Sequence, residues 1–413
     1  MTATLDTIVS IGAGQTAAVA ARTLRRRGFD GRIVLIGDEN HAPYQRPPLS
    51  KEFLAGTESL DSLMLLPPSW REKNHVELMT GTAASRIDTG AGVVELADGR
   101  TIAADAVLIA TGGRPRTMAV TGPAPERTHY LRTIDDAQRL STHLRPGTHV
   151  ALIGGGFVGL EIASTARSLG CEVTVIERAP IPLAHIVGAE MGAVCTRLQR
   201  DNGVHVVTGV DVTAVHTEQS EVRISLSSGE IVGADVVVIG IGIEPNVEIA
   251  RASGLAVDNG IVVDVQGRTA TPNVFAAGDV ASRYSDRAGR HMRVEHFDNA
   301  SRQGAATANL MLGREGVNDA PHWFWSDQFG VNLQFTGRAE HTEIVTRGNV
   351  HDGEFTAFYL DDGIVRGAFA LDRGDDIGAA RELIGKQCSA DRLRDIDIDL
   401  FDLLDDEELA ASN

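Results

Sequence analysis

The sequence predicts an α/β protein in which two doubly wound domains precede a small α+β domain. Three observations lead to this prediction. A strand, glycine turn, helix and second strand follow one another twice, starting near residues 6 and 149. Short alternating segments with aromatic residues fill the chain after residue 321. Finally, 413 residues are too many for one ordinary hydrophobic core, so two or three domains are expected.

The first unit starts with an apolar strand over residues 6–11 (DTIVSI), which runs into a turn containing Gly12 and Gly14. A helical stretch follows, and a second strand over 32–36 (RIVLI) leads to Asp38. The first glycine permits a sharp turn, and the second lets a pyrophosphate approach the helix N-terminus. The acid after the second strand can bind a ribose hydroxyl. This unit therefore predicts a dinucleotide site.

The same order returns with a strand over residues 149–153 (HVALI) and a turn containing Gly154, Gly156 and Gly159. The second strand of this unit ends at Glu177. One glycine turn is weak evidence, because such turns also occur for purely steric reasons, but two complete units predict two dinucleotide sites. A glutamate here would accept a bond from a ribose 2′-hydroxyl and repel a 2′-phosphate, so NADH is favoured over NADPH.

Each unit is followed by a segment that closes a nucleotide-binding domain. These segments are residues 106–115 (AVLIATGGRP) and 234–246 (ADVVVIGIGIEPN), each a buried strand with a glycine-rich turn. A further strand in 271–280 (TPNVFAAGDV) ends at Gly278 and Asp279. Ligands bind at the carboxyl ends of parallel strands in such sheets, so this acid is a candidate for cofactor binding.

Five motifs in this order resemble the pyridine nucleotide-disulfide oxidoreductase class of flavoproteins: GAGxxA, ATGGRP, GGGFVGLE, GIGIEPN and NVFAAGDV. Within that class, residues 43–51 (PYQRPPLSK) and 324–328 (FWSDQ) resemble the ferredoxin reductases of oxygenase systems, of the putidaredoxin reductase type. The resemblance runs from residue 8 to about 371, and RPPLSK is its most specific part. It implies a glutathione reductase-like arrangement of the two nucleotide-binding domains, with FAD in the first site and NADH in the second.

The resemblance and the two glycine turns together give the candidate cofactor-binding residues. Those expected to contact FAD are Gly12, Gly14, Thr16, Asp38, Arg46, Lys51, Ala84, Thr111, Gly112, Arg132, Gly278, Asp279, Phe297 and Trp325. Those expected to contact NADH are Gly154, Gly156, Gly159, Glu161, Glu177 and Gly242. Other members of the class often carry Val or Trp where this chain has Phe297, so its contact is expected to come from the backbone.

Lys51 and Glu161 are the candidate catalytic residues. A flavin that accepts a hydride gains negative charge, and a fixed cation such as Lys51 would stabilise it. The resemblance implies that Glu161 pairs with this lysine and contacts the nicotinamide. Trp325 would shield the flavin edge and line the exit for electrons. The alternatives are a solvated loop lysine and a tryptophan in the core of the C-terminal sheet.

The three cysteines, Cys171, Cys195 and Cys388, exclude several related chemistries. No CxxxxC pair or single cysteine follows the first glycine unit, so disulfide and peroxide reduction lack their nucleophile. A [2Fe–2S] cluster needs four ligands, so the electron acceptor is expected to be a separate protein. No metal site is predicted. The net charge of −18 argues against nucleic-acid binding. Part of it lies in an acidic tail expected to be a solvated helix or a frayed end, with Asp395, Asp397, Asp399, Asp402, Asp405, Asp406, Glu407 and Glu408.

The leading hypothesis is an NADH:ferredoxin oxidoreductase that supplies a cytochrome P450 or a Rieske oxygenase through a [2Fe–2S] ferredoxin. A rubredoxin reductase is a near alternative. A signalling flavoprotein resembling apoptosis-inducing factor would change its oligomeric state on binding NADH, although that relative uses a basic surface and this chain is acidic. A plain NADH oxidase would consume oxygen in step with NADH.

The predicted FAD-binding domain comprises residues 1–113 and 243–320, with the NAD-binding domain inserted as 114–242 and a C-terminal domain over 321–413. In the last, residues 331–336, 343–346, 355–360 and 364–369 are expected to form an antiparallel sheet, followed by helix from 375. Residues 61–70 and 313–321 are expected to be loops. No membrane span or signal peptide is predicted, and a cytoplasmic location is expected.

Overall fold

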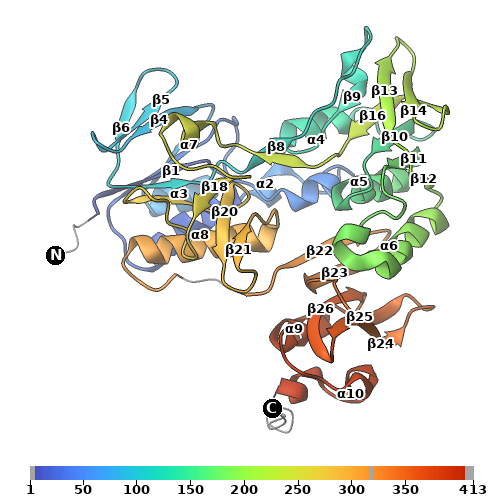
Figure 1. Cartoon of the computed structure of the whole chain (residues 1–413). Helices are drawn as coiled ribbons and strands as arrows, with labels where there is room; N and C mark the ends of the chain where they lie inside the picture. The colour runs from blue at the N-terminus through green and yellow to red at the C-terminus, as the bar shows by residue number, and fades with distance from the viewer. Residues whose placement is uncertain (1–4, 317–319, 405–413) are drawn as a thin grey trace. The chain divides into compact units, whose positions relative to one another are not determined.

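The computed structural model describes residues 5–316 and 320–404 (Figure 1). Contacts between residues divide the chain into two compact units. The first unit comprises Met1–Pro47, Glu58–Arg114 and Ile243–Asp319, and the second comprises Pro48–Thr57, Pro115–Gly242 and Ala320–Asn413. The last residues of the acidic tail, from Asp405 onward, lie outside the described residues.

A parallel sheet with the strand order β19-β7-β1-β2-β3 forms the centre of the first unit. Its strands are β1 (Thr7–Ile11), β2 (Arg32–Ile36), β3 (Val76–Met79), β7 (Ala106–Ile109) and β19 (Val274–Ala276). The apolar runs expected as strands are thus strands, and β1 is buried over Ile8–Ile11 because it lies in the middle of the sheet. Helix α1 (Gln15–Arg26) follows the first glycine turn and packs against α8 (Phe297–Met311).

Smaller elements surround this sheet. One antiparallel sheet consists of β4 (Ala84–Asp88), β5 (Val93–Leu96) and β6 (Thr101–Ala103). A mixed sheet consists of β20 (Ala281–Ser285), which pairs antiparallel with β21 (Arg290–Met292) and parallel with β18 (Ile261–Val263). β8 (Gly113–Pro115) pairs with β17 (Ile243–Pro245), and the remaining helices of this unit are α2 (Leu60–Leu63), α3 (Pro68–Lys73) and α7 (Glu248–Ala252). The short helix η1 (Pro47–Ser50) starts at the last residue of the segment Met1–Pro47 and belongs to the second unit from Pro48 onward. The prediction of a loop over 61–70 is therefore wrong, since α2 and α3 reach into it. Both helices are too short to show a repeating apolar face in the sequence.

The second unit repeats the parallel arrangement in the order β12-β11-β10-β16-β9. Its strands are β9 (Thr128–His129), β10 (His149–Ile153), β11 (Glu172–Glu177), β12 (His205–Thr208) and β16 (Val236–Ile239). Its helices are η2 (Pro125–Arg127), α4 (Ile134–Ser141), α5 (Phe157–Ser168) and α6 (Ala184–Asp201), the last interrupted at Gly188. An antiparallel meander of β13 (Val212–Thr217), β14 (Val222–Leu226) and β15 (Ile231–Ala234) completes this part.

The C-terminal segment forms the antiparallel sheet that its alternating pattern predicted, in the order β22-β23-β26-β25-β24 (Figure 1). Its strands are β22 (Trp323–Gln328), β23 (Val331–Gly337), β24 (Glu343–Asn349), β25 (Glu354–Asp361) and β26 (Ile364–Leu371). The helices that follow are α9 (Gly374–Leu383), α10 (Ala390–Arg394) and η3 (Leu400–Leu404). The predicted fold class, α/β with two doubly wound domains and a small α+β domain, is confirmed.

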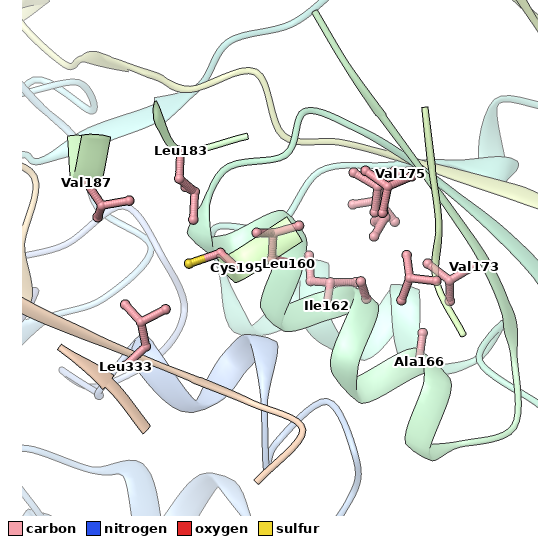
Figure 2. Packing of buried hydrophobic residues seen from close by; sticks show 14 of the residues in the cluster. Leu160, Ile162, Ala166, Val173, Val175, Leu183, Val187, Cys195 and Leu333 are labelled. Atoms are coloured by element: carbon pink, nitrogen blue, oxygen red, sulfur yellow. The ribbon is translucent and has the colours of Figure 1, made fainter. Parts of the chain in front are cut away.

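One apolar cluster in the second unit joins α5 to the sheets on either side of it. Figure 2 shows Leu160 and Ile162 of α5 with Val173 and Val175 of β11, and Leu333 of β23 belongs to the same cluster. Burying each such side chain stabilises the fold by about 2 kcal/mol. This packing holds α5 firmly, and α5 carries Glu161.

Candidate functional site

The first glycine turn has the shape that a pyrophosphate needs. Gly12 has φ +107°, and a Cβ there would lie 2.1 Å from the carbonyl oxygen of Ala110, so no other residue fits. Gly14 is the N-cap of α1, and because it has no side chain it makes no side-chain cap hydrogen bond to the helix. A Cβ on Gly14 would meet nothing within 4 Å. The helix N-terminus is therefore open to an anion, which fits the diphosphate of FAD.

Thr16, Gly278 and Phe297 come together around the same turn. The buried Thr16 packs directly against Gly278 at the end of β19, and the Gly278 N–H donates to Oε1 of Gln303 in α8 at 2.8 Å. Gln15 reaches α8 as well, because its Nε2 donates to the Ser301 hydroxyl at 2.8 Å. That hydroxyl donates to the backbone oxygen of Phe297 at 2.9 Å. These bonds fix the backbone of the first turn of α8 beside the glycine turn.

Arg46 lies in a small charged cluster that the sequence did not indicate. Its Nη2 is 2.6 Å from Oε1 of Glu39, and the Tyr44 hydroxyl donates to the other oxygen of that carboxylate at 2.5 Å. The guanidinium also lies over the Tyr44 ring, 5.2 Å from its centroid. Removal from water opposes its charge, but Tyr44, Glu39 and Asp279 outweigh this effect and raise the pKa of Arg46. The predicted residues Arg46 and Asp279 are thus within electrostatic reach of each other.

The other candidates of the first unit are placed as follows. Asp38 is exposed at the carboxyl end of β2, and Ala84 is the half-buried first residue of β4. The Thr111 hydroxyl donates to the backbone oxygen of Asn246 at 2.7 Å, and the Asn246 N–H donates to the backbone oxygen of Gly112 at 3.0 Å. Asn246 therefore holds the turn that follows β7.

The second glycine turn repeats the features of the first. Gly154 has φ +106°, and a Cβ there would lie 2.3 Å from the backbone oxygen of Gly240. Gly159 sits against the turn, since its Cβ would lie 2.5 Å from the backbone oxygen of Gly154. Gly156 is the N-cap of α5, and a Cβ on it would meet nothing within 4 Å. This turn therefore also leaves room for a diphosphate, which fits NADH.

Glu177 lies at the end of β11 and is bound to the glycine turn. One carboxylate oxygen accepts the Gly155 N–H at 2.6 Å, and the other accepts the Ala179 N–H at 2.7 Å. Arg178 points into solvent, with 83% of its side chain exposed, and lies 3.9 Å from Asp211. A carboxylate has about four lone-pair positions, so Glu177 keeps capacity for a ribose hydroxyl.

Lys51 and Glu161 form a buried ion pair. Lys51 Nζ is 2.9 Å from Oε2 of Glu161, and only 10% and 6% of the two side chains are exposed. The same oxygen accepts the Ser50 hydroxyl at 2.5 Å, and Oε1 accepts the Ser326 hydroxyl at 2.7 Å. The structure therefore brings the two predicted catalytic residues together. It adds Ser50 and Ser326, which the sequence analysis missed.

The remaining candidates of the second unit are Trp325, Arg132 and Gly242. Trp325 is half-buried in β22 and stacks on Trp323, with ring centroids 5.3 Å apart and an interplanar angle of 24°. Arg132 precedes α4, and its backbone N–H donates to Asp136 at 3.1 Å. Gly242 is exposed, and its carbonyl oxygen accepts the backbone N–H of Arg116 at 2.9 Å.

The cysteines are free and buried. Burial raises the pKa of Cys195 to about 12 and also raises the pKa of Cys171. Neither residue therefore supplies a reactive thiolate at neutral pH. This fits the prediction that the chain does not carry out thiol chemistry.

The functional residues that the sequence missed share one property. Ser326 bonds Glu161 across 165 positions, and Gln303 bonds Gly278 across 25. Serine and glutamine are common at the surface, so their identity alone carries no signal. Two missed residues lie in motifs that were singled out: Ser50 in PYQRPPLSK, where Lys51 was chosen instead, and Ser326 in FWSDQ, where Trp325 was chosen instead.

Among residues 5–316 and 320–404, no helix has both the length and the apolar character that a bilayer crossing requires.

Comparison with known proteins shows the family to which the chain belongs. Residues 6–304 match the pyridine nucleotide-disulphide oxidoreductase family, and residues 323–404 match the reductase C-terminal domain. A ferredoxin–NAD(+) reductase component of an anthranilate 1,2-dioxygenase system from Burkholderia cepacia is 41% identical over 92% of this chain and 94% of its own length. Putidaredoxin reductase of Pseudomonas putida is 34% identical and covers 92% of each chain.

Two solved structures are similar over nearly the whole chain. The covalent putidaredoxin reductase–putidaredoxin complex has a TM-score of 0.92 at 32% identity, covering 98% of this chain and 99% of the other. A ferredoxin reductase for a P450 system of Rhodopseudomonas palustris has a TM-score of 0.91 at 36% identity, covering 97% of this chain and all of the other. The resemblance predicted from the motifs is confirmed, with FAD and NADH as the cofactors of the family. The chain belongs to the pyridine nucleotide-disulphide oxidoreductase family, and its similar relatives are the ferredoxin reductases of oxygenase systems.

Proposed function

We propose that this chain is an FAD-dependent NADH:ferredoxin oxidoreductase, which passes electrons from NADH to a [2Fe–2S] ferredoxin that serves a cytochrome P450 or a Rieske oxygenase. The relatives above are reductase components of such systems, and one solved relative is a complex with its ferredoxin. The observation within this chain that carries the proposal is the buried Lys51–Glu161 pair. Its glutamate lies on α5, the helix that starts at the second glycine turn.

The two glycine turns divide the binding of the cofactors between them. Gly12, Gly14 and Thr16 at the first turn, with Gly278 and Asp279, would hold the FAD diphosphate and its neighbouring groups. Gly154, Gly156 and Gly159 would hold the NADH diphosphate, and Glu177 would bind the adenosine ribose. Bound FAD supplies the chemistry of accepting a hydride from NADH and releasing the two electrons singly.

Lys51 and Glu161 would act together at the reacting end of the nucleotide. Glu161 lies five residues after Gly156 on α5, about 7 Å along the helix from its N-terminus. In this position the Glu161 carboxylate would orient the nicotinamide. The ammonium of Lys51 would balance the negative charge that the flavin gains when NADH reduces it. Because both groups are buried, water screens their charges poorly, and their positions are fixed before NADH binds.

Trp325 is proposed to line the path by which electrons leave. Its ring is stacked on Trp323, which also carries Arg381 over its face, 5.7 Å from the ring centroid. This stack keeps an aromatic surface in one orientation on β22. Replacing Trp325 with Ala should slow ferredoxin reduction while the rate of flavin reduction by NADH stays within about twofold.

The function is tested with the purified protein loaded with FAD. NADH should reduce its flavin, and the reduced protein should then reduce a [2Fe–2S] ferredoxin, followed by the ferredoxin absorbance. Reduction of a rubredoxin but of no [2Fe–2S] ferredoxin would indicate the rubredoxin reductase. Oxygen loss matching NADH loss would indicate an oxidase. A long-lived reduced state with NADH-driven dimerisation and no carrier reduction would indicate a signalling flavoprotein.

We also propose the three-domain division at residues 113/114, 242/243 and 320/321. The chain passes between the two compact units next to Arg114 and again next to Gly242, which supports the first two boundaries. The change from parallel to antiparallel strands after residue 320 supports the third. A cytoplasmic location is part of the proposal and is supported by three buried cysteines that form no disulfide with one another.

A further inference from the structure

A chain of buried polar side chains extends from Glu161 into the C-terminal sheet. The Ser326 hydroxyl donates to Oε1 of Glu161 at 2.7 Å and accepts from Gln328 Nε2 at 2.9 Å. Gln328 Oε1 accepts in turn from Gln199 Nε2 at 2.7 Å. Ser326, Gln328 and Gln199 are exposed by 0%, 1% and 0%. All four side chains belong to the second unit.

The members of this chain come from three elements, α5, α6 and β22. Ser326 and Gln328 alternate with half-buried positions on β22, so both point to the same face of the strand. Gln199 comes from α6 and also donates to the backbone oxygen of Leu160 in α5 at 3.3 Å. The apolar cluster around α5 surrounds these groups. Water therefore does not replace a lost bond easily, and each bond has a large effect on orientation.

The hydrogen bonds all run in one direction, toward the carboxylate. Gln199 donates to Gln328, Gln328 donates to Ser326, and Ser326 donates to Glu161. A serine hydroxyl has one hydrogen, and the bond from Gln328 occupies its oxygen, so the hydrogen is directed at Glu161. Bonds aligned in this way strengthen one another.

The two carboxylate oxygens of Glu161 thus have different anchors. Oε2 receives Ser50 and Lys51, whereas Oε1 receives Ser326. Without the Ser326 hydroxyl, the Glu161 carboxylate would keep its ion pair with Lys51, but Oε1 could swing away while Oε2 stayed in place. The negative charge would remain where it is, and the orientation of the carboxylate plane would be lost.

We propose that Ser326 is a positioning residue, which orients the Glu161 carboxylate for the nicotinamide ring of NADH. This inference rests on the proposed function, because it takes Glu161 as the group that faces the nicotinamide. It gives the C-terminal domain a part in binding NADH in addition to its proposed role toward ferredoxin. A purely structural role is the competing explanation, in which the polar chain only attaches β22 to α5 and α6.

Ligands with and without a nicotinamide separate the two explanations. ADP-ribose has the diphosphate and both riboses of NAD⁺ but lacks the nicotinamide ring. In Ser326→Ala, titration calorimetry on the FAD-loaded protein should show the dissociation constant of NAD⁺ rising about tenfold, which corresponds to about 1.4 kcal/mol. The dissociation constant of ADP-ribose should stay within twofold. In rapid-mixing experiments, the limiting rate of flavin reduction by NADH should fall as well.

Three further variants complete the test. Ser326→Thr retains the hydroxyl and should recover most of the NAD⁺ affinity. Thr336→Val removes a buried hydroxyl from the neighbouring strand of the same sheet, where it donates to the His322 carbonyl at 2.9 Å, and should leave both ligands unaffected. If Ser326→Ala does not fold, Ser326→Cys has a similar shape and a weaker donor, and should show the same selective loss to a smaller extent.

The outcomes separate this inference from the proposed function. Equal loss of NAD⁺ and ADP-ribose in the Ser326 variants, or no loss of either, would overturn the positioning role while the wild-type protein still reduces ferredoxin. Failure of the wild-type protein to bind NAD⁺ or to accept electrons from NADH would overturn the proposed function itself.

Discussion

The ion pair of Lys51 and Glu161 is buried within the second unit. Its carboxylate receives three donors, from Lys51, Ser50 and Ser326. Burying two opposite charges brings little net stability, because the loss of hydration offsets their attraction. Removing one partner is far more costly, since it leaves the other charge buried and unpaired. A pair of this kind therefore indicates a function rather than a contribution to stability.

The first prediction concerns Lys51. Lys51→Met keeps the length of the side chain and removes the charge, so the limiting rate of flavin reduction by NADH should fall by about 100-fold. Stopped-flow absorbance at the flavin band measures this rate. Lys386→Met is the matched control, because Lys386 is exposed and its ammonium donates to the Leu404 carbonyl, and its rate should equal that of the wild type. Equal rates in both variants would contradict the role of Lys51.

The second prediction concerns the choice between NADH and NADPH. Glu177→Arg replaces the carboxylate with a cation that can bind a 2′-phosphate, so the ratio of kcat/KM for NADPH to that for NADH should rise at least tenfold. Glu177→Gln is the control, since it removes the negative charge without adding a positive one, and should mainly weaken NADH. Steady-state kinetics with both nucleotides checks the ratio. An unchanged ratio in Glu177→Arg would place the ribose elsewhere.

The sequence predicted part of this site and not the rest, for a physical reason. The glycines and Glu177 belong to a local motif, and the RPPLSK and GGGFVGLE segments identified Lys51 and Glu161 as partners. Other residues of the site are distant in the chain from the residues that they bond, and they are of common polar types. Examples are Ser326, which bonds Glu161, and Gln303, which bonds Gly278. Asp38 was chosen at the end of β2, but the acid held by Arg46 and Tyr44 is the next residue, Glu39.

At the scale of elements, the glycine turns and the helices that follow them set the geometry. Gly154 and Gly156 lie in one turn but meet different surroundings. A Cβ on Gly154 would collide with the Gly240 backbone, whereas a Cβ on Gly156 would point into open space. Gly156 has φ −77°, which any residue adopts. The same small side chain would therefore disturb the fold at one position and the ligand space at the other.

The third prediction uses this contrast. Gly156→Ala should keep the melting temperature within about 2 °C of the wild type while the dissociation constant of NAD⁺ rises at least tenfold, because the methyl group occupies the space for the diphosphate. Gly154→Ala should lower the melting temperature through strain and collision with backbone. Thermal melts and calorimetric titrations measure the two effects. Unchanged NAD⁺ binding in Gly156→Ala would move the diphosphate away from this helix end.

Element prediction succeeded where the pattern was long and failed where it was short. The apolar runs at residues 6–11, 32–36 and 149–153 became central strands because a strand buried on both faces has to be apolar throughout. The alternating segments after 321 became an antiparallel sheet for the corresponding reason. The turns of α2 and α3 within 61–70 have too few residues for any periodicity, so tertiary contacts decide their structure.

At the scale of the whole molecule, stability should depend on pH through a buried histidine pair. His129 lies on β9, 6% exposed, with its ring 5.0 Å from that of His143. Its Nε2 has no hydrogen-bond partner among the described residues. Burial, assisted by His143 and Arg139 and opposed by Asp136, lowers the pKa of His129 to about 4. Burial also lowers the pKa of His143, with Arg127 and Arg145 acting in the same direction and Glu126 against it.

The sign of the fourth prediction follows from this lowered pKa. Above about pH 6.5, His129 is neutral in the folded and the unfolded chain, so its full contribution to stability is present. As the pH falls from 6.5 toward 4, the unfolded chain binds a proton that the folded chain does not. The free energy of unfolding then decreases by about 1.4 kcal/mol per pH unit, or about 2 kcal/mol at pH 5.

Replacing His129 with Phe removes the titrating group and keeps a ring against His143. Between pH 7.5 and 5.0, the wild-type protein should therefore lose about 2 kcal/mol more unfolding free energy than His129→Phe, as measured by urea titration followed by circular dichroism. His205→Phe, which replaces an exposed histidine on β12 of the same unit, should lose as much as the wild type. If His129→Phe is as sensitive to acid as the wild type, the loss comes from other groups and the buried pair does not control it. If it is less sensitive by about the expected amount, the edge of this parallel sheet sets the lower pH limit of the fold.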